Sequence, residues 1–182
     1  MSQAARGAFW TWSLEHYQHD GAEHLLLRMQ DEFQLNVNVL LWTCWCATRF
    51  EPLTEEIVIE ALDLTRPWAA NVTAPLRAAR RYLKSPGDLV TDSEVLSLRD
   101  AIKNNELAAE RIEQSLLEQL AESRLGRVSG DQTPHDTRAR RNLSTYAALT
   151  GVMDAPGFTT SLLESLAGHI FMGAPQSAVI GD

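Results

Sequence analysis

The sequence has few of the features that usually identify a function. It contains two cysteines in 182 residues, which are too few for a disulfide framework. It also contains no P-loop, GxGxxG, GxSxG, CxxC or DDxxD-like motif. An assignment as an enzyme would therefore rest on scattered polar residues alone, so a non-enzymatic role is favoured. No catalytic residue, metal site or cofactor is predicted.

Basic residues are scarce relative to acidic ones. The chain has 16 lysines and arginines against 24 aspartates and glutamates, a formal net charge of −8. Because such an excess of acid is repelled by phosphate backbones, nucleic acid is disfavoured as a partner. The first 21 residues lack the charged, then apolar, then small-residue order of a secretory signal, so we expect a cytoplasmic protein.

Long apolar runs are also missing, and the most apolar stretch is "NVNVLLWTCWCATRF" at 36–50. Its nearly unbroken run from Val37 to Ala47 would span roughly 17 Å as a helix, whereas a bilayer core needs about 20 apolar residues. No membrane span is therefore expected. The length favours a helix, Asn36 is a good N-cap, and apolar residues on all sides predict a position inside a bundle.

Within this helix, two cysteines and one asparagine raise separate questions. Cys44 and Cys46 are two residues apart, hence about 160–200° apart around a helix, and cannot share a metal. They are predicted to be buried thiols. Asn38, Trp42 and Trp45 lie on one face of the helix. Because a buried amide needs partners, Asn38 either bonds a neighbouring helix or points into a polar cavity.

The rest of the chain also reads as helical, with no convincing strand. Helices are expected at 9–19, 21–34, 36–50, 55–65, 68–84, 91–125, 137–150 and 159–169. Pro67 and Pro75 make the 68–84 segment either a kinked helix or two short pieces. The prediction is one all-α domain, 1–182, with a main helical bundle at 8–126, a flexible loop at 127–136, additional weaker helices at 137–169 and a loose tail at 170–182.

The longest helix carries a heptad-like pattern. Thr91 to Glu94 has the spacing of a capping box. Steps of three and four then follow through Val95, Leu98, Ile102, Asn105, Ala109, Ile112 and Leu116. Such a seam must pack on another helix, either of the same chain or of a second copy, so a homodimer through this helix is one prediction.

Two sets of charges lie on the predicted helices. Five cations without an intervening acid precede the long helix: Arg66, Arg77, Arg80, Arg81 and Lys84. Three carboxylates lie on it: Glu106, Glu110 and Glu113. If the two segments pack antiparallel, the charges form structural ion pairs. Alternatively, the arginines bind a phosphate or carboxylate through their bidentate forks.

Near the N-terminus, His16, His19, Asp20, Glu23 and His24 are close in sequence. A metal site on a helix needs ligands three or four residues apart on one continuous face. Gly21 is expected to break the helix between them, so we interpret these residues as solvated turn residues.

Three segments occur in an order that resembles a family of small, uncharacterised proteobacterial proteins. They are "MQDEFQLNVNVLLWTCW", "APLRAARRYLK" and "NELAAERIE", and the resemblance spans roughly Phe9 to Leu125. The matching positions are Gln30, Asp31, Asn38, Trp45, Arg77, Arg80, Arg81, Glu106, Glu110 and Arg111. The resemblance implies a bacterial cytosolic protein and an all-helical fold, and it supplies no activity.

Two hypotheses of function follow. The leading one is a non-enzymatic helical adaptor or regulatory protein that acts through contacts with an unidentified protein. The alternative is a small-molecule binder, or an enzyme, with a polar cavity that holds an anionic ligand. The residues proposed to bind that ligand are Gln30, Asn38, Trp42, Trp45, Arg77, Arg80, Arg81, Glu106 and Glu110. A pocket above about 300 Å³ reached by Asn38 and Arg80 would favour the alternative.

Overall fold

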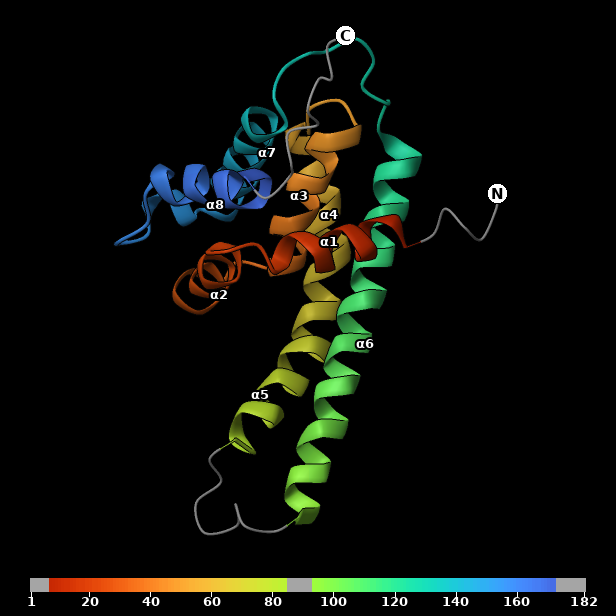
Figure 1. Cartoon of the computed structure of the whole chain (residues 1–182), viewed down its shortest axis with the longest axis vertical. Helices are drawn as coiled ribbons and strands as arrows, with labels where there is room; N and C mark the ends of the chain where they lie inside the picture. The colour runs from red at the N-terminus through yellow and green to blue at the C-terminus, as the bar shows by residue number, and fades with distance from the viewer. Residues whose placement is uncertain (1–6, 85–92, 173–182) are drawn as a thin grey trace, which may run out of the picture.

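The structure, a computed structural model, describes residues 7–84 and 93–172. Its elements in chain order are α1 (Ala8–Tyr17), α2 (Ala22–Phe33), α3 (Val37–Arg49), α4 (Glu55–Trp68), the π-helical segment η2 (Ala69–Thr73), α5 (Ala74–Tyr82), α6 (Ser93–Arg124), α7 (His135–Thr150), the 3₁₀ turn η4 (Val152–Asp154) and α8 (Thr160–Met172) (Figure 1). The described ranges contain no β-strand beyond one isolated bridge between Phe50 and Arg127. The predicted all-α class is confirmed.

α3 lies at the centre of the molecule. Ten of its 13 residues are buried, and the predicted N-cap is confirmed because the Asn36 Oδ1 accepts hydrogen bonds from the backbone N–H groups of Asn38 and Val39 at 2.9 and 3.3 Å. Both cysteines are free and buried, and burial raises the pKa of the Cys44 thiol to about 12. No described helix has both the length and the apolar character needed to cross a bilayer.

The C-terminal helices belong to the same hydrophobic core as α3. α7 packs along α3, and Leu143, Leu163 and Leu166 lie in the core cluster. The buried Asn142 joins two backbones: its amide donates to the Thr43 carbonyl at 3.0 Å, and its oxygen accepts from the Leu53 N–H at 3.0 Å. α8 continues to Met172, beyond the end expected at 169, and residues 173–182 lie outside the described part.

α4, η2 and α5 form one continuous helical path through two prolines. Pro67 lies inside α4, and the chain stays helical past it. Pro75 has no N–H, and its ring would crowd the carbonyl of Asn71 in a regular α-helix. The chain accommodates this with a wider turn, in which the Ala74 N–H donates to the Ala69 carbonyl. Of the two predicted forms for this segment, a distorted helix is therefore the one observed.

The long helix is confirmed, and its predicted seam is corrected. α6 has 32 residues and packs against α1, α3, α4, η2 and α5. Its buried residues are Glu106, Ala109, Glu113, Gln114, Leu117, Glu118 and Ala121. Every second seam position therefore faces outward, with Leu98 and Ile112 about half exposed. The reason is that α6 meets different helices along its length, not one coiled-coil partner. The predicted cap at Thr91 and the 85–88 turn lie outside the described residues.

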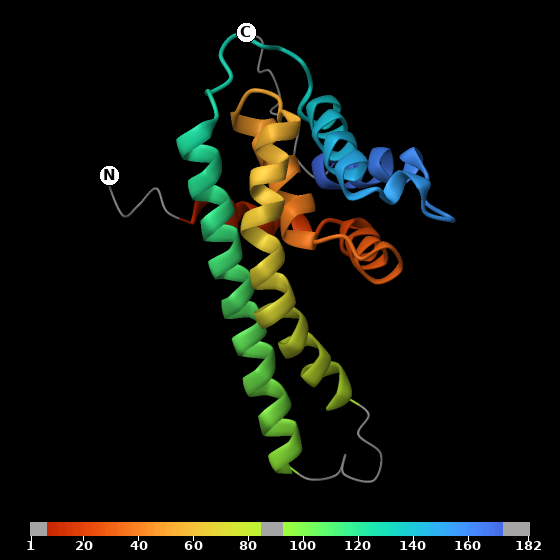
Figure 2. The same cartoon turned by 180° about the vertical axis from the view of Figure 1, so that it is seen from behind.

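Two regions differ in shape. α5 and residues 93–110 of α6 extend away from the other helices as a two-helix arm, hereafter the arm (Figures 1 and 2). α1, α2, α3, α7 and α8 gather around the remaining parts of α4 and α6, and this region is hereafter the body.

Candidate functional site

A hollow of about 400 Å³ lies where the body meets the arm. The N-terminus of α3, the α4–η2–α5 path, α6 and α7 all contribute to its lining. Asn38 is among the lining residues, which answers the question that the sequence left open: its side chain reaches a polar cavity and also bonds a neighbouring helix. A smaller hollow of about 280 Å³ adjoins it and shares Gln30, Gln34, Ala74 and Arg77 with it.

The floor of the larger hollow is a network of amides around one carboxylate. Glu113 is 1% exposed. Its Oε1 accepts from the Asn36 amide at 2.6 Å, and its Oε2 accepts from the Asn38 amide at 2.9 Å. The Asn38 oxygen accepts in turn from Gln114 at 2.8 Å, and the Gln114 oxygen accepts from the Ser13 hydroxyl at 2.8 Å. Desolvation raises the pKa of Glu113, and the two asparagine hydrogen bonds offset this only in part.

Tyr146 of α7 brings a hydroxyl to the same hollow. Its oxygen accepts the Asn36 backbone N–H at 3.0 Å, so it is held beside the Glu113 network. Burial raises the pKa of Tyr146 to about 12, and the group therefore keeps its proton near neutral pH. Because this proton finds no acceptor among the described residues, Tyr146 retains one unused donor.

Thr73 supplies a second unused hydroxyl. It is 3% exposed and lines the hollow, and its Oγ1 has no hydrogen-bond partner in the described part of the chain. Thr65, two turns earlier and also in the lining, donates instead to the Ala61 carbonyl at 2.8 Å. In the π-helical segment the Ala69 carbonyl, four residues before Thr73, accepts the Ala74 N–H and makes no hydrogen bond with the Thr73 hydroxyl. Thr73 is therefore a buried lining residue whose hydroxyl has no partner among the described residues.

Two arginines line the hollow, and they differ in their partners. Arg66 is exposed and forms no ion pair with any described residue. Arg77 donates from Nε to Glu106 at 3.0 Å and from Nη2 to Glu110 at 2.9 Å. Its Nη1 makes no hydrogen bond within the described ranges. Arg66 is therefore the cation with the most freedom to meet a ligand.

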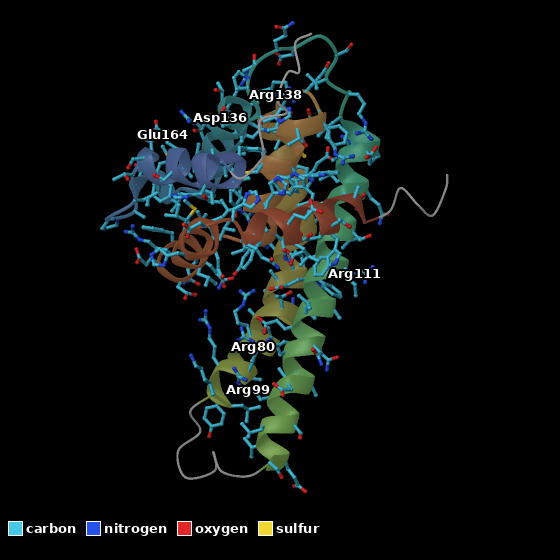
Figure 3. All side chains as sticks on the ribbon, viewed as in Figure 1. Arg80, Arg99, Arg111, Asp136, Arg138 and Glu164 are labelled. Carbon is cyan, nitrogen blue, oxygen red and sulfur yellow. The ribbon has the colours of Figure 1, made fainter. Side chains whose placement is uncertain are left out.

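Arg80 lies in the arm, outside the lining of both hollows (Figure 3). Its Nε forms a short ion pair with the Glu106 Oε2, so the predicted structural ion pairs between α5 and α6 are confirmed. Desolvation opposes the charge on Glu106, but the hydrogen bonds from Arg80 and Arg77 outweigh it and hold the pKa of this carboxyl below its usual value. Glu106 is thus a paired anion, which does not suit it to act as a base.

The nine residues predicted to bind a ligand therefore fall into separate places. Gln30, Asn38 and Arg77 line the larger hollow, and Arg81 lines the smaller one, where it pairs with Asp31. The lining of neither hollow includes Trp42, Trp45, Arg80, Glu106 or Glu110.

The two tryptophans belong to the core. The Trp42 Nε1 donates to the Leu117 carbonyl at 2.9 Å. The Trp45 ring packs against Phe9 and Phe50 at centroid distances of 5.2 and 5.4 Å, and its Nε1 has no partner among the described residues. Both rings fill space between helices and do not border either hollow.

The site reasoning from sequence omitted four residues that matter to the hollow: Arg66, Thr73, Glu113 and Tyr146. Arg66 and Glu113 belonged to the predicted sets of cations and carboxylates, so their charges were a signal in the sequence that could have identified them. The π-helical turn that carries Thr73 has a sequence cause in Pro75. For Tyr146 no local signal exists, because α7 reaches the hollow only through its packing on α3.

His16 and His19 have packing roles. His16 stacks on Trp12 with ring centroids 4.0 Å apart, and the His19 Nδ1 lies 2.9 Å from the Ile170 carbonyl of α8. Both side chains are half-buried, so they are not the solvated turn residues that the sequence suggested. No group of three or more His, Cys, Asp or Glu among the described residues is arranged to hold a metal.

Fold and site together define an all-helical protein with an open hollow of mixed charge at the junction of its body and arm. The chain belongs to the family described as "Protein of unknown function (DUF2390)", whose match covers residues 8–117. The predicted resemblance to an uncharacterised family is thereby confirmed. Comparison with curated proteins and with solved structures found no match. The family match includes Glu113 and ends before Tyr146.

Proposed function

We propose that this protein binds a small polar molecule in the larger hollow and holds an anionic group of that molecule through Arg66 and Arg77. The observation that carries the proposal is a hollow of about 400 Å³ in which buried hydroxyls keep unused hydrogen-bonding capacity. Ligand pockets typically measure about 300–1,000 Å³ and contain a few convergent polar groups on a mostly apolar lining. Leu35, Leu62 and Ala70 supply such apolar surface here.

The cationic part of this proposal differs from the one that the sequence suggested. Arg80 is occupied by Glu106 and lies outside the lining, whereas Arg77 keeps a free Nη1 and Arg66 is unpaired within the described ranges. An arginine with free N–H groups can bind a carboxylate or phosphate with paired hydrogen bonds. The ligand-binding alternative is therefore supported through Asn38, Arg66 and Arg77.

A protein-observed NMR screen tests the proposal. The full-length protein would be titrated with a library of small polar metabolites, and binders should shift the signals of residues that line the hollow. Ala74→Phe should abolish these shifts, because Ala74 borders both hollows. Ala79→Phe places the same ring on an exposed position of α5 outside both linings, and it should leave binding intact. The proposal would be overturned if the binders caused the same shifts in Ala74→Phe as in the wild type, or if the library contained no binder.

A second candidate is the adaptor or regulatory role, acting through the outer face of α6. Leu98 and Ile112, which are two heptads apart and lie on the same face of α6, are 53% and 48% exposed. Exposed apolar side chains repeated along one helix favour a protein contact, either with another protein or with a second copy of α6. A bacterial cytosolic setting, which the resemblance implied, suits either candidate.

Light scattering tests the dimeric form of this second candidate. A dimer that becomes a monomer in Leu98→Glu/Ile112→Glu, and not in the exposed control Asn104→Glu, would support it. A wild-type monomer across the accessible concentration range would exclude the homodimer. Affinity capture with the same variants would then test for a different protein partner.

A further inference from the structure

Glu113 is a buried carboxylate with no cation paired to it among the described residues. Its exposure is 1%, and its two oxygens accept only amide donors, from Asn36 and Asn38. No lysine, arginine or histidine of the described residues lies within ion-pair distance of it. Arg77 acts on it only at longer range, because its guanidinium is bonded to Glu106 and Glu110. Burial of a charge is costly unless an opposite charge compensates it.

The position of Glu113 at the floor of the hollow matters here. A carboxylate sealed inside a helix pair could be compensated only by the protein, whereas this one borders a space large enough for a small molecule. Each carboxylate oxygen can accept more than one hydrogen bond, so both keep capacity after the two amide contacts. The raised pKa of Glu113, caused first by desolvation, agrees with an anion that lacks a neutralising partner.

The opposite charge lies in the lining of the same hollow. Arg66 borders it without an ion pair to any described residue, and Arg66 and Glu113 do not pair with each other. The lining also includes the small side chains of Ala69 and Ala70 and the Thr73 hydroxyl, which has no partner among the described residues. One hollow therefore presents an unneutralised anion and an unneutralised cation.

We propose that the ligand of this hollow is a small zwitterion, whose ammonium group binds the Glu113 carboxylate and whose carboxylate or phosphate group binds Arg66. A simple anion would satisfy Arg66 but would add negative charge near Glu113. A simple cation would compensate Glu113 and leave Arg66 unused. The Tyr146 proton and the Thr73 hydroxyl add uncharged hydrogen bonds to either group. This inference rests on the proposed function, because it names the chemical class of the molecule bound there.

A matched series of probes tests the inference on the full chain. ω-Amino acids with two to six carbons would be compared with the carboxylic acid and the primary amine of the same length, by calorimetry and by NMR titration. At the best length, the amino acid should bind at least about tenfold more tightly than either single-charge analogue, since it gains hydrogen bonds to a charged group at both ends.

Two variants assign the ends of the ligand. Glu113→Gln should remove the advantage of the amino acid over the acid, and Arg66→Gln should remove its advantage over the amine. Arg81→Gln is the matched control, because Arg81 lies outside the larger hollow and should leave the order of affinities unchanged. Circular dichroism would establish that each variant is folded. If Glu113→Gln fails to fold, the Arg66→Gln variant still tests the inference, because Arg66 is exposed.

The possible failures are distinguishable. If acids bind as tightly as amino acids at every length, or if Glu113→Gln leaves the advantage of the ammonium group intact, the zwitterion is excluded while binding in the hollow stands. A series without any binder, beside a library screen that does yield hollow-specific binders, likewise overturns only the zwitterion. If the screen yields none, the proposed function itself fails.

Discussion

The centre of the body and the outer helix of the arm are held in place by different forces. α3 buries ten of its 13 residues, whereas α5 buries none of its nine. α3 is enclosed by apolar and aromatic side chains from α1, α2, α6 and α7. The contact of α5 with α6 includes the ion pairs of Arg77 and Arg80 with Glu106 and Glu110.

From this difference we infer that the body should be rigid and that the arm should open more readily. Apolar burial is the dominant favourable term in folding, and ion pairs that reach solvent contribute about 0–1 kcal/mol each. We therefore expect the arm to open locally while the body stays folded. The hollow lies at this boundary, with Glu113 and Tyr146 on the body side and Thr73 and Arg77 on the wall that leads into the arm. A ligand there would contact both regions.

Removal of a ring from the body should have the largest effect. Trp42→Ala deletes a fully buried indole and its hydrogen bond to Leu117, so we expect the free energy of unfolding to fall by about 3–5 kcal/mol. Urea denaturation followed by circular dichroism measures this. The control Tyr82→Ala, at a residue of the arm that is 66% exposed, should change stability by less than about 0.5 kcal/mol. Equal losses would contradict the contrast between the two regions.

Removal of the central carboxylate of the arm should have a smaller and local effect. Glu106→Gln weakens the ion pairs to Arg77 and Arg80. Hydrogen exchange should show the opening free energy of α5 amides fall by roughly 1–2 kcal/mol, with α3 amides unaffected. Glu32→Gln, which removes the exposed pair with Arg28, serves as the control and should change neither. A uniform loss of protection would mean that arm and body unfold together.

The smallest expected effects are changes in folding stability with pH, and those from Glu106 and Glu113 should have opposite signs. Glu106 has a lowered pKa in the folded protein, so its stabilising contribution is present above its unfolded pKa and is lost as pH falls through the folded value. Glu113 has a raised pKa, so its contribution is present below its unfolded pKa and is lost as pH rises through the folded value.

Urea denaturation at a series of pH values between about 7 and about 3 would measure both slopes. At each pH, the free energy of unfolding of the wild type is compared with that of Glu106→Gln and with that of Glu113→Gln. On acidification the wild type should lose its advantage over Glu106→Gln and gain relative to Glu113→Gln. Slopes of the same sign would show that the two carboxylates do not differ in environment as the structure implies.

Much of the fold was predictable because it depends on local chemistry. The run at 36–50 is too short for a membrane and apolar on all sides, and it forms the central helix with Asn36 as its cap. The ion pairs between α5 and α6 followed from charge sets on two neighbouring helices. By contrast, Gly21 was expected only to break the helix, and it is also the N-cap of α2, in a left-handed conformation (φ 82°). That turn approaches His169 of α8, a contact remote in sequence.

The candidate site was predictable only in part, because its residues come from seven helical elements, α2 to α5, η2, α6 and α7. Gln30, Asn38 and Arg77 were named from sequence and do line the hollow. Arg80 was favoured over Arg66 as the ligand-binding cation, and the structure pairs Arg80 with Glu106. Periodicity assigns a residue to a face of its helix, but it does not say which neighbouring helix covers that face.

The sequence by itself determined the helical class, the long helix, the buried thiols and the charge sets that join two neighbouring helices. These properties depend on residue type and spacing along one helix, which persist in any packing. Only the tertiary structure decided which carboxylate has no cation beside it among the described residues. Glu106 and Glu113 are one heptad apart on α6, yet the first meets Arg77 and Arg80 while the second meets Asn36 and Asn38. The physical reason is that charge compensation is a contact between helices, and contacts between helices are decided by how the helices pack.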